Sequence, residues 1–168
     1  LRQVIKRSCS VGMLDWSVAF RVALEISRGL TVLEKAGVVH RNITPTSILR
    51  TPEGQCKLAG VSLAKARESE NCEQITRQGE VVGEVAYLAP ELFLLNSFDH
   101  RTDLYGLGAI VYGLLSGRPP YRAETISQLL KEQMAGDPPR PKTFQLSIHE
   151  MFEGAILRLL SRNPFDRY

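Results

Sequence analysis

The sequence predicts a mainly α-helical domain with one small β-hairpin, an α+β fold. Three observations lead to this prediction. Apolar residues recur at three- and four-residue steps over residues 16–35, and they occur nearly all round over residues 102–116. Two short apolar runs near residue 50 are separated by a turn that contains Pro and Gly. The chain has 168 residues, a length that suits one domain with a sizeable core.

The composition excludes several classes of protein. Hydrophobic residues make up 43% of the chain and charged residues 23%, and the net charge of +3 is too small to indicate nucleic-acid binding by itself. There is no run of about 18 apolar residues, so we expect no membrane segment in this chain. The three cysteines, Cys9, Cys56 and Cys72, lack paired spacing, which disfavours a disulfide framework or a zinc site and favours a reduced, cytoplasmic location.

The first predicted helix runs from Trp16 to Lys35. Asp15 is a suitable N-cap, and Gly37 supplies the stop signal after the last turn. The residues expected on its buried face are Trp16, Phe20, Ala23, Leu24, Ser27, Leu30 and Leu33.

A polar loop over residues 40–47 leads into the predicted hairpin. Its strands are residues 48–50 and 56–58, and the turn between them is residues 51–54. Cys56 lies in the second strand, so we interpret it as a core residue rather than a redox sensor. Residues 66–84 are polar and aperiodic and form the longest predicted loop.

Three further helices are predicted. The helix over residues 102–116 should be central and buried, and Gly117 ends it. A helix over residues 125–135 should bury Ile126, Leu129, Leu130 and Met134. After a Pro-rich connector over residues 137–141, a capping box formed by Ser147 and Glu150 should begin a helix over residues 151–160.

Six segments, in order and across nearly the whole chain, resemble motifs of Ser/Thr protein kinases. Residues 40–49, His-Arg-Asn-Ile-Thr-Pro-Thr-Ser-Ile-Leu, resemble the catalytic loop H-R-D-L-K-P-x-N-I-L. The others are residues 57–65 (K-L-A-D-F-G-L-A-K in the family), 83–91 (G-T-x-x-Y-M-A-P-E), 103–108 (D-x-x-S-L-G), 115–121 (L-T-G-x-P-P-F) and 163–167 (D-P-x-x-R). The resemblance implies that residues 1–168 form the C-terminal lobe of a kinase-like fold. The N-terminal lobe is absent, so we expect a piece of a larger protein.

The resemblance also implies that the catalytic positions have changed. Asn42 replaces the aspartate that accepts the substrate proton, and Thr44 replaces the lysine that contacts the transferred phosphate. Ser47 replaces the asparagine that holds magnesium, and Gly60 replaces the metal-binding Asp of D-F-G. Val61 and Ser62 replace the Phe and Gly of D-F-G, and Glu84 replaces the threonine that supports the base. No metal is expected at this site.

Framework positions of the family are kept. The resemblance implies that His40 is a packed residue, that Glu91 pairs with Arg167, and that Asp103 braces the backbone of the catalytic loop. Thr76, with Ser69, is a candidate phosphorylation site whose phosphate would dock on Arg41. The alternative is an unmodified polar loop.

These substitutions predict a pseudokinase without phosphotransfer activity, which acts in signalling as a scaffold or allosteric regulator. Its expected partner is a protein, such as an active kinase or its substrate, and not nucleic acid. No cofactor is expected for this chain; ATP and Mg²⁺ apply only to the alternative, a divergent active Ser/Thr kinase joined to its N-terminal lobe. A third interpretation is a remnant with no independent role, whose uncovered face would promote aggregation.

Overall fold

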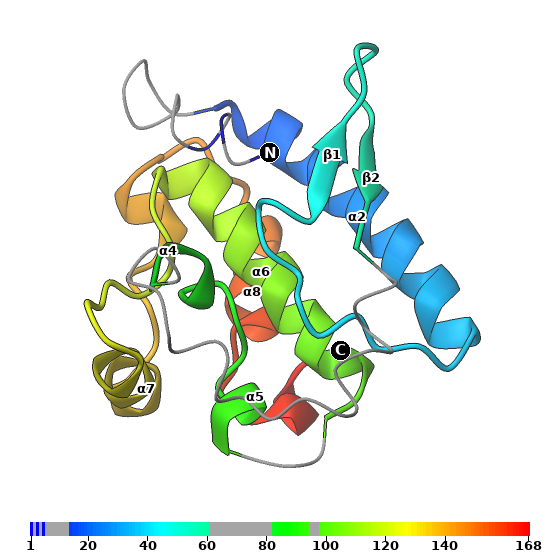
Figure 1. The fold of residues 1–168 in the computed structure, drawn as a ribbon. Coiled ribbons are helices and arrows are strands. Elements are labelled where there is room, and N and C mark those ends of the chain that lie inside the picture. The colour runs from blue at the N-terminus through cyan, green and yellow to red at the C-terminus, as the bar shows by residue number, and fades with distance from the viewer. Residues whose placement is uncertain (2, 4, 6–13, 61–81, 95–97) are drawn as a thin grey trace.

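The computed structural model describes residues 1, 3, 5, 14–60, 82–94 and 98–168. Among these residues it contains helices around one long central helix and a two-stranded hairpin at one side (Figure 1). The helices are α2 (Trp16–Lys35), α4 (Val82–Val85), α5 (Glu91–Leu94), α6 (His100–Ser116), α7 (Ile126–Ala135) and α8 (Glu150–Leu159), with short 3₁₀ turns η2 (Pro141–Thr143) and η3 (Pro164–Asp166). The strands are β1 (Ile48–Arg50) and β2 (Cys56–Leu58). The predicted fold class is therefore confirmed.

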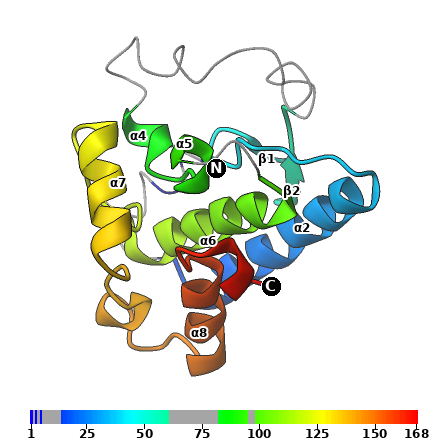
Figure 2. The same ribbon diagram turned by 90° about the horizontal axis from the view of Figure 1, so that it is seen from below.

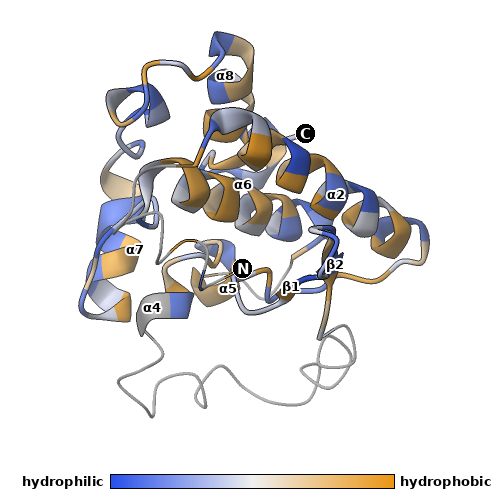
Figure 3. Cartoon of the chain, turned by 90° about the horizontal axis from the view of Figure 1, so that it is seen from above, coloured by the Kyte–Doolittle hydropathy of each residue, from blue (hydrophilic) through white to orange (hydrophobic). Residues whose placement is uncertain are grey.

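Helix α6 is the centre of the molecule, as its apolar sequence predicts. It lies alongside α2 and contacts α8 (Figure 2), and most of its residues are buried. The hydropathy colouring shows apolar residues along nearly all of α6, whereas α2 alternates between polar and apolar residues (Figure 3). The helix begins two residues earlier than predicted, because the Asp99 carboxylate caps it by accepting a hydrogen bond from the Arg101 N–H. It ends at Gly117, whose φ of 71° is the left-handed conformation of a C-terminal stop.

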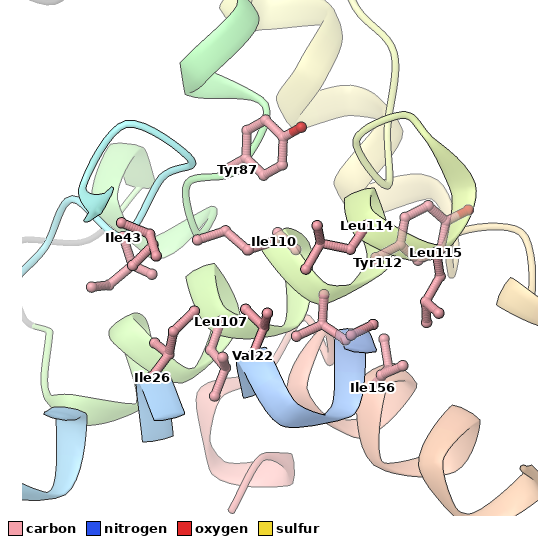
Figure 4. Packing of buried hydrophobic residues seen from close by; sticks show 14 of the residues in the cluster. Val22, Ile26, Ile43, Tyr87, Leu107, Ile110, Tyr112, Leu114, Leu115 and Ile156 are labelled. Carbon is pink, nitrogen blue, oxygen red and sulfur yellow. The ribbon is translucent and has the colours of Figure 1, made fainter. Parts of the chain in front are cut away.

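One hydrophobic core joins these elements. Ile110 and Leu114 of α6, Val22 of α2 and Ile156 of α8 are all buried and pack together (Figure 4). Ile43, in the loop before the hairpin, also belongs to this core. Each such side chain contributes about 1.5–3 kcal/mol on burial, so the core anchors that loop firmly.

The bounds of α2 agree with the prediction, but its buried face does not. The face that meets the core is made of Ala19, Val22, Ile26 and Leu30. Phe20 and Leu24 were predicted to be buried, yet both are 42% exposed. Apolar residues form two overlapping stripes on this helix, and the stripe that lacks aromatic side chains packs against α6. Phe20 packs edge-on against Phe152 instead, with ring centroids 5.2 Å apart.

The buried face of α7 also differs from the prediction. Thr125 caps the helix and Leu129 is buried, but Met134 is 51% exposed and Gln133 takes its place in the interior. The Gln133 amide donates to the Leu88 carbonyl and to the Tyr105 hydroxyl. A polar side chain can occupy the core here because these partners satisfy its N–H groups.

The predicted capping box before α8 does not form. His149 is the N-cap, and its ring Nδ1 accepts from the Met151 N–H at 3.3 Å. Ile148 is 2% exposed, and a turn from its N–H to the Gln145 carbonyl brings it into the core. The helix begins at Glu150, one residue before the predicted start, and Ser147 lies two residues before its N-cap.

The hairpin has the predicted strands and turn. Ile48 lies opposite Leu58 and Arg50 lies opposite Cys56 in antiparallel register. The Gly54 N–H closes the turn on the Thr51 carbonyl at 2.9 Å. Cys56 is buried, as expected of a core residue. None of the described helices is long and apolar enough to cross a membrane.

Candidate functional site

The candidate site is the loop that connects α2 to the hairpin, and α6 holds its backbone in place. The Asp103 carboxylate accepts from the backbone N–H groups of His40 and Arg41, both at 2.7 Å. These bonds fix Arg41 in a left-handed conformation, with φ 63°, that non-glycine residues rarely adopt. Burial raises the pKa of Asp103, and the two N–H donors oppose that rise by stabilising the carboxylate.

A close contact between the loop and α6 fixes the distance between them. Ile43 is 2% exposed and sits directly on Gly106. A Cβ atom at Gly106 would lie 2.6 Å from the Ile43 Cβ and 2.8 Å from its carbonyl oxygen. Glycine is therefore required at this position for the loop to lie where it does.

His40 ties the loop to the segment that follows the hairpin. Its ring Nε2 is 2.9 Å from the Ala59 carbonyl, and the Ala59 N–H donates to the Ser47 carbonyl at 2.8 Å. The His40 side chain is buried, which suits the framework role that the resemblance implies. Gly60 follows directly, exposed and with φ 88°. The structure thus brings Ser47 and Gly60, the two positions of the family's metal ligands, to one side of the hairpin.

Hydroxyl groups of the loop bond to one another and to its backbone. The Ser47 hydroxyl donates to the Thr44 carbonyl at 2.9 Å and accepts from the Thr44 N–H at 3.0 Å. The Thr44 and Thr46 hydroxyls are 3.0 Å apart, and Thr46 donates to the Glu84 carboxylate at 3.0 Å. Because a hydroxyl has one proton, Thr46 gives its proton to Glu84 and Thr44 must donate to Thr46. The chain of bonds therefore runs from Thr44 through Thr46 to Glu84 on α4.

This arrangement limits the chemistry of the site. No residue in the described part of the chain hydrogen-bonds to the half-buried side chain of Asn42. The Ser47 hydroxyl bonds to the backbone N–H and carbonyl of Thr44 in its own loop, and Gly60 has no side chain. Among residues 1, 3, 5, 14–60, 82–94 and 98–168, no three His, Cys, Asp or Glu side chains gather as a metal site would require.

The framework pair lies beside the first turn of α6. Arg167 and Glu91 form a bidentate ion pair, with Nη1–Oε1 at 2.6 Å and Nη2–Oε2 at 3.0 Å, and both side chains are almost fully buried. Thr102 also donates to Glu91, and Arg167 also donates to the carbonyls of Ser161, Arg162 and Arg101. The pair that the resemblance implies is therefore present, and its polar atoms are well satisfied.

Two features of the site were missed from the sequence. The Arg41 guanidinium lies over the Phe98 ring, 4.3 Å from its centroid. The Thr46–Glu84 bond spans 38 positions, and no periodic pattern announces it. The candidate phosphorylation sites Thr76 and Ser69, and the substituted Val61 and Ser62, lie outside the described residues.

An open cavity of about 600 Å³ lies along the end of the loop and β1, next to residues 1 and 3. Its lining includes Pro45, Thr46, Leu49 and Arg50. Leu49 is 58% exposed, so the cavity offers an apolar surface next to the hydroxyl chain.

The comparisons with known proteins agree with this geometry. The model of the family described as "Protein kinase domain" matches residues 1–168. Serine/threonine-protein kinase PknH of Mycobacterium bovis is 31% identical over 168 residues, which cover 100% of this chain and 27% of that protein. PknL of Mycobacterium tuberculosis is 33% identical over 140 residues, covering 83% of this chain and 34% of that protein. PknE of the same species is 31% identical over 150 residues, covering 89% and 26%.

The chain thus spans about a quarter to a third of the length of these relatives. Its helical architecture with one hairpin is that of the C-terminal lobe of the kinase fold. Because the family model covers every residue, the chain belongs to the protein kinase domain family.

Proposed function

We propose that this chain is the C-terminal lobe of a pseudokinase, a protein kinase domain that transfers no phosphate and acts by binding another protein as a scaffold or allosteric regulator. The observation that carries the proposal is the chain of hydroxyl bonds from Thr44 through Thr46 to Glu84. Uncharged side chains fill the loop positions at which the family has a base, a phosphate-binding lysine and a metal ligand.

The loop lacks the base of an active kinase. In a kinase, an aspartate in this loop orients the substrate hydroxyl and accepts its proton. Asn42 occupies that position, and an amide oxygen is not basic at neutral pH. Loss of a general base alone lowers the rate by about 10²–10⁴-fold.

The loop also lacks the metal ligands of an active kinase. Magnesium requires oxygen ligands, with carboxylates preferred, to neutralise the charge that develops on the phosphoryl group. Gly60 supplies no side chain, and the Ser47 hydroxyl is engaged with Thr44. Thr44 itself is fully buried and neutral, so it supplies no cation for the phosphate.

The framework contacts of the lobe are retained. Breaking a buried ion pair costs about 3–5 kcal/mol, so Glu91 and Arg167 make a large contribution to keeping the lobe folded. The Asp103 brace holds the loop although its catalytic residues are gone. A protein that retains its fold and loses its chemistry is suited to binding, and the proposed partner is an active kinase or the substrate of one.

A phosphotransfer assay with the complete protein tests the proposal. We expect no Mg²⁺-dependent transfer from ATP to the protein itself or to a generic Ser/Thr substrate. The double variant Asn42→Asp with Gly60→Asp is the attempted rescue. A Cβ at Gly60 has only ordinary contacts, 3.9 Å from the His40 ring, so there is space for the aspartate, although the φ of 88° strains its backbone. Asn42→Asp with Gly154→Asp is the matched control, since Gly154 is exposed and remote. Robust transfer by the unmodified protein would overturn the proposal.

The second candidate function is a divergent ATP-dependent Ser/Thr kinase that works when joined to an N-terminal lobe. Two observations favour it: the open cavity beside Leu49, and the Glu84 carboxylate at the edge of the loop. Thermal unfolding with ATP, with and without Mg²⁺, separates the two functions. Stabilisation that requires Mg²⁺ favours the kinase, whereas none, or stabilisation by ATP alone, favours the pseudokinase.

A further inference from the structure

We propose that a second cavity, between α5, the end of α7 and the segment around η3, binds a short segment of a partner protein that combines apolar and basic side chains. The cavity measures about 610 Å³ and lies away from the catalytic loop and the hairpin. Its apolar lining includes Pro90, Leu94 of α5, Met134 of α7 and Pro164 of η3. The proposal does not depend on the loss of phosphotransfer, because none of these residues belongs to the catalytic loop.

The apolar lining is unusually accessible. Leu94 is 52% exposed and Met134 is 51% exposed, although both project from helices whose other faces are packed. Met134 is flexible and polarizable, which allows it to adapt to side chains of different shape. Exposed apolar residues that gather around one hollow mark an interaction site more often than scattered ones do.

The charges around the cavity select the occupant. Glu91 also lines it, but this carboxylate is neutralised by Arg167. Arg162 is held by a hydrogen bond to the Met134 carbonyl. The carboxylates of Asp137 and Asp166 are exposed and form no hydrogen bond or ion pair with the described residues.

Two unpaired carboxylates against the single cation of Arg162 leave the rim with a net charge of −1. An occupant that places leucine-like side chains on Leu94 and Met134 therefore gains further from lysine or arginine beside Asp137 and Asp166. An acidic segment of the same shape is disfavoured by the same charges.

Fluorescence anisotropy with three labelled hexapeptides tests the proposal on the full chain. The probe GRLLRG carries both features, GELLEG reverses the charge, and GRSSRG removes the apolar pair. We expect saturable binding of GRLLRG below about 1 mM, and affinities at least fivefold weaker for the other two peptides. Amide chemical shifts in an NMR titration with GRLLRG should change at Met134, Asp137 and residues 161–166.

Variants on the exposed rim locate the site without threatening the fold. Asp137→Asn with Asp166→Asn should weaken GRLLRG binding about fivefold at low salt, and added salt should reduce this difference. Met134→Ser should weaken binding to a similar extent. Met151→Ser is the matched control, since Met151 is 80% exposed on α8, and it should leave binding unchanged.

Three outcomes would overturn the inference. They are the absence of saturable binding, equal binding of the three peptides, and binding that the Asp137, Asp166 and Met134 substitutions leave unchanged. Sedimentation of the chain alone supplies a further check. If the chain dimerises and Met134→Ser abolishes the dimer, the cavity belongs to a second copy and the proposed partner is wrong.

Discussion

Replacing Arg167 with methionine removes the cation of the buried ion pair and should destabilise the lobe severely. In the structure Arg167 and Glu91 are 2% and 3% exposed, and two hydrogen bonds join them. The variant leaves the Glu91 carboxylate in the interior, with Thr102 as its remaining hydrogen-bond donor among the described residues. An uncompensated buried charge of this kind costs about 3–5 kcal/mol.

That cost is a large fraction of the free energy of unfolding of a single domain, which is about 5–15 kcal/mol. For a chain of this size each kcal/mol lowers the melting temperature by about 2–4 °C, so we expect a fall of about 10 °C. Adding Glu91→Gln to Arg167→Met neutralises the stranded carboxylate. The double variant should therefore be more stable than the sum of the two single effects predicts.

Urea unfolding followed by circular dichroism measures these differences. Arg101→Gln is the matched control, because Arg101 pairs with Asp99 at 2.9 Å while both side chains remain partly exposed. It should cost less than about 1 kcal/mol. If Arg167→Met is no more harmful than Arg101→Gln, the buried pair does not stabilise the lobe and the argument for a retained framework fails.

Three further predictions concern the loop and the core. Gly106→Ala should lower the free energy of unfolding by about 1–3 kcal/mol, because the added methyl group pushes the loop away from α6. The control is Gly154→Ala on the exposed face of α8, which should not destabilise the protein, and thermal unfolding compares the two variants. Asp103→Asn should cost about 1–3 kcal/mol, because an amide offers one acceptor oxygen to two N–H donors that now bond a carboxylate, and urea unfolding measures this. Burial, with the nearby Asp137 charge, raises the pKa of Tyr121 to about 12. The folded state therefore keeps a proton that the unfolded chain loses near pH 10, so the free energy of unfolding should fall as pH rises between about 10 and 12. Tyr121→Phe should make this fall less steep, and thermal unfolding at several pH values in this range measures it.

Local signals in the sequence predicted the longer helices and the hairpin, but not α4, which begins inside the predicted loop over residues 66–84, nor α5. The limits of α2 follow from Asp15 and the glycine after its last turn, and the hairpin follows from the turn that ends at Gly54. These signals succeed because caps and turns depend on residues close together in the chain. The faces of helices were predicted less well, as Phe20 and Met134 illustrate. Which apolar stripe is buried depends on the shape of a partner element that the helix sequence does not contain.

The candidate site depended on long-range contacts even more strongly. The pairing of Glu91 with Arg167 joins residues 76 positions apart and could be expected only from the resemblance to a family. The bond between Thr46 and Glu84 joins two polar, accessible residues, for which no pattern of burial or periodicity gives a signal. The chemistry that the site lacks could be inferred from residue types, whereas the hydroxyl chain that fills its place required coordinates.

The most direct test of the central claim is a single-turnover measurement, with the complete protein in excess over labelled ATP and Mg²⁺ present. We predict no phosphoryl transfer above the rate without protein, and no change on replacing Glu84 with glutamine. Mg²⁺-dependent transfer that the Glu84→Gln variant loses would contradict the account, because it would make Glu84 of α4 a catalytic carboxylate at a site that we describe as having none.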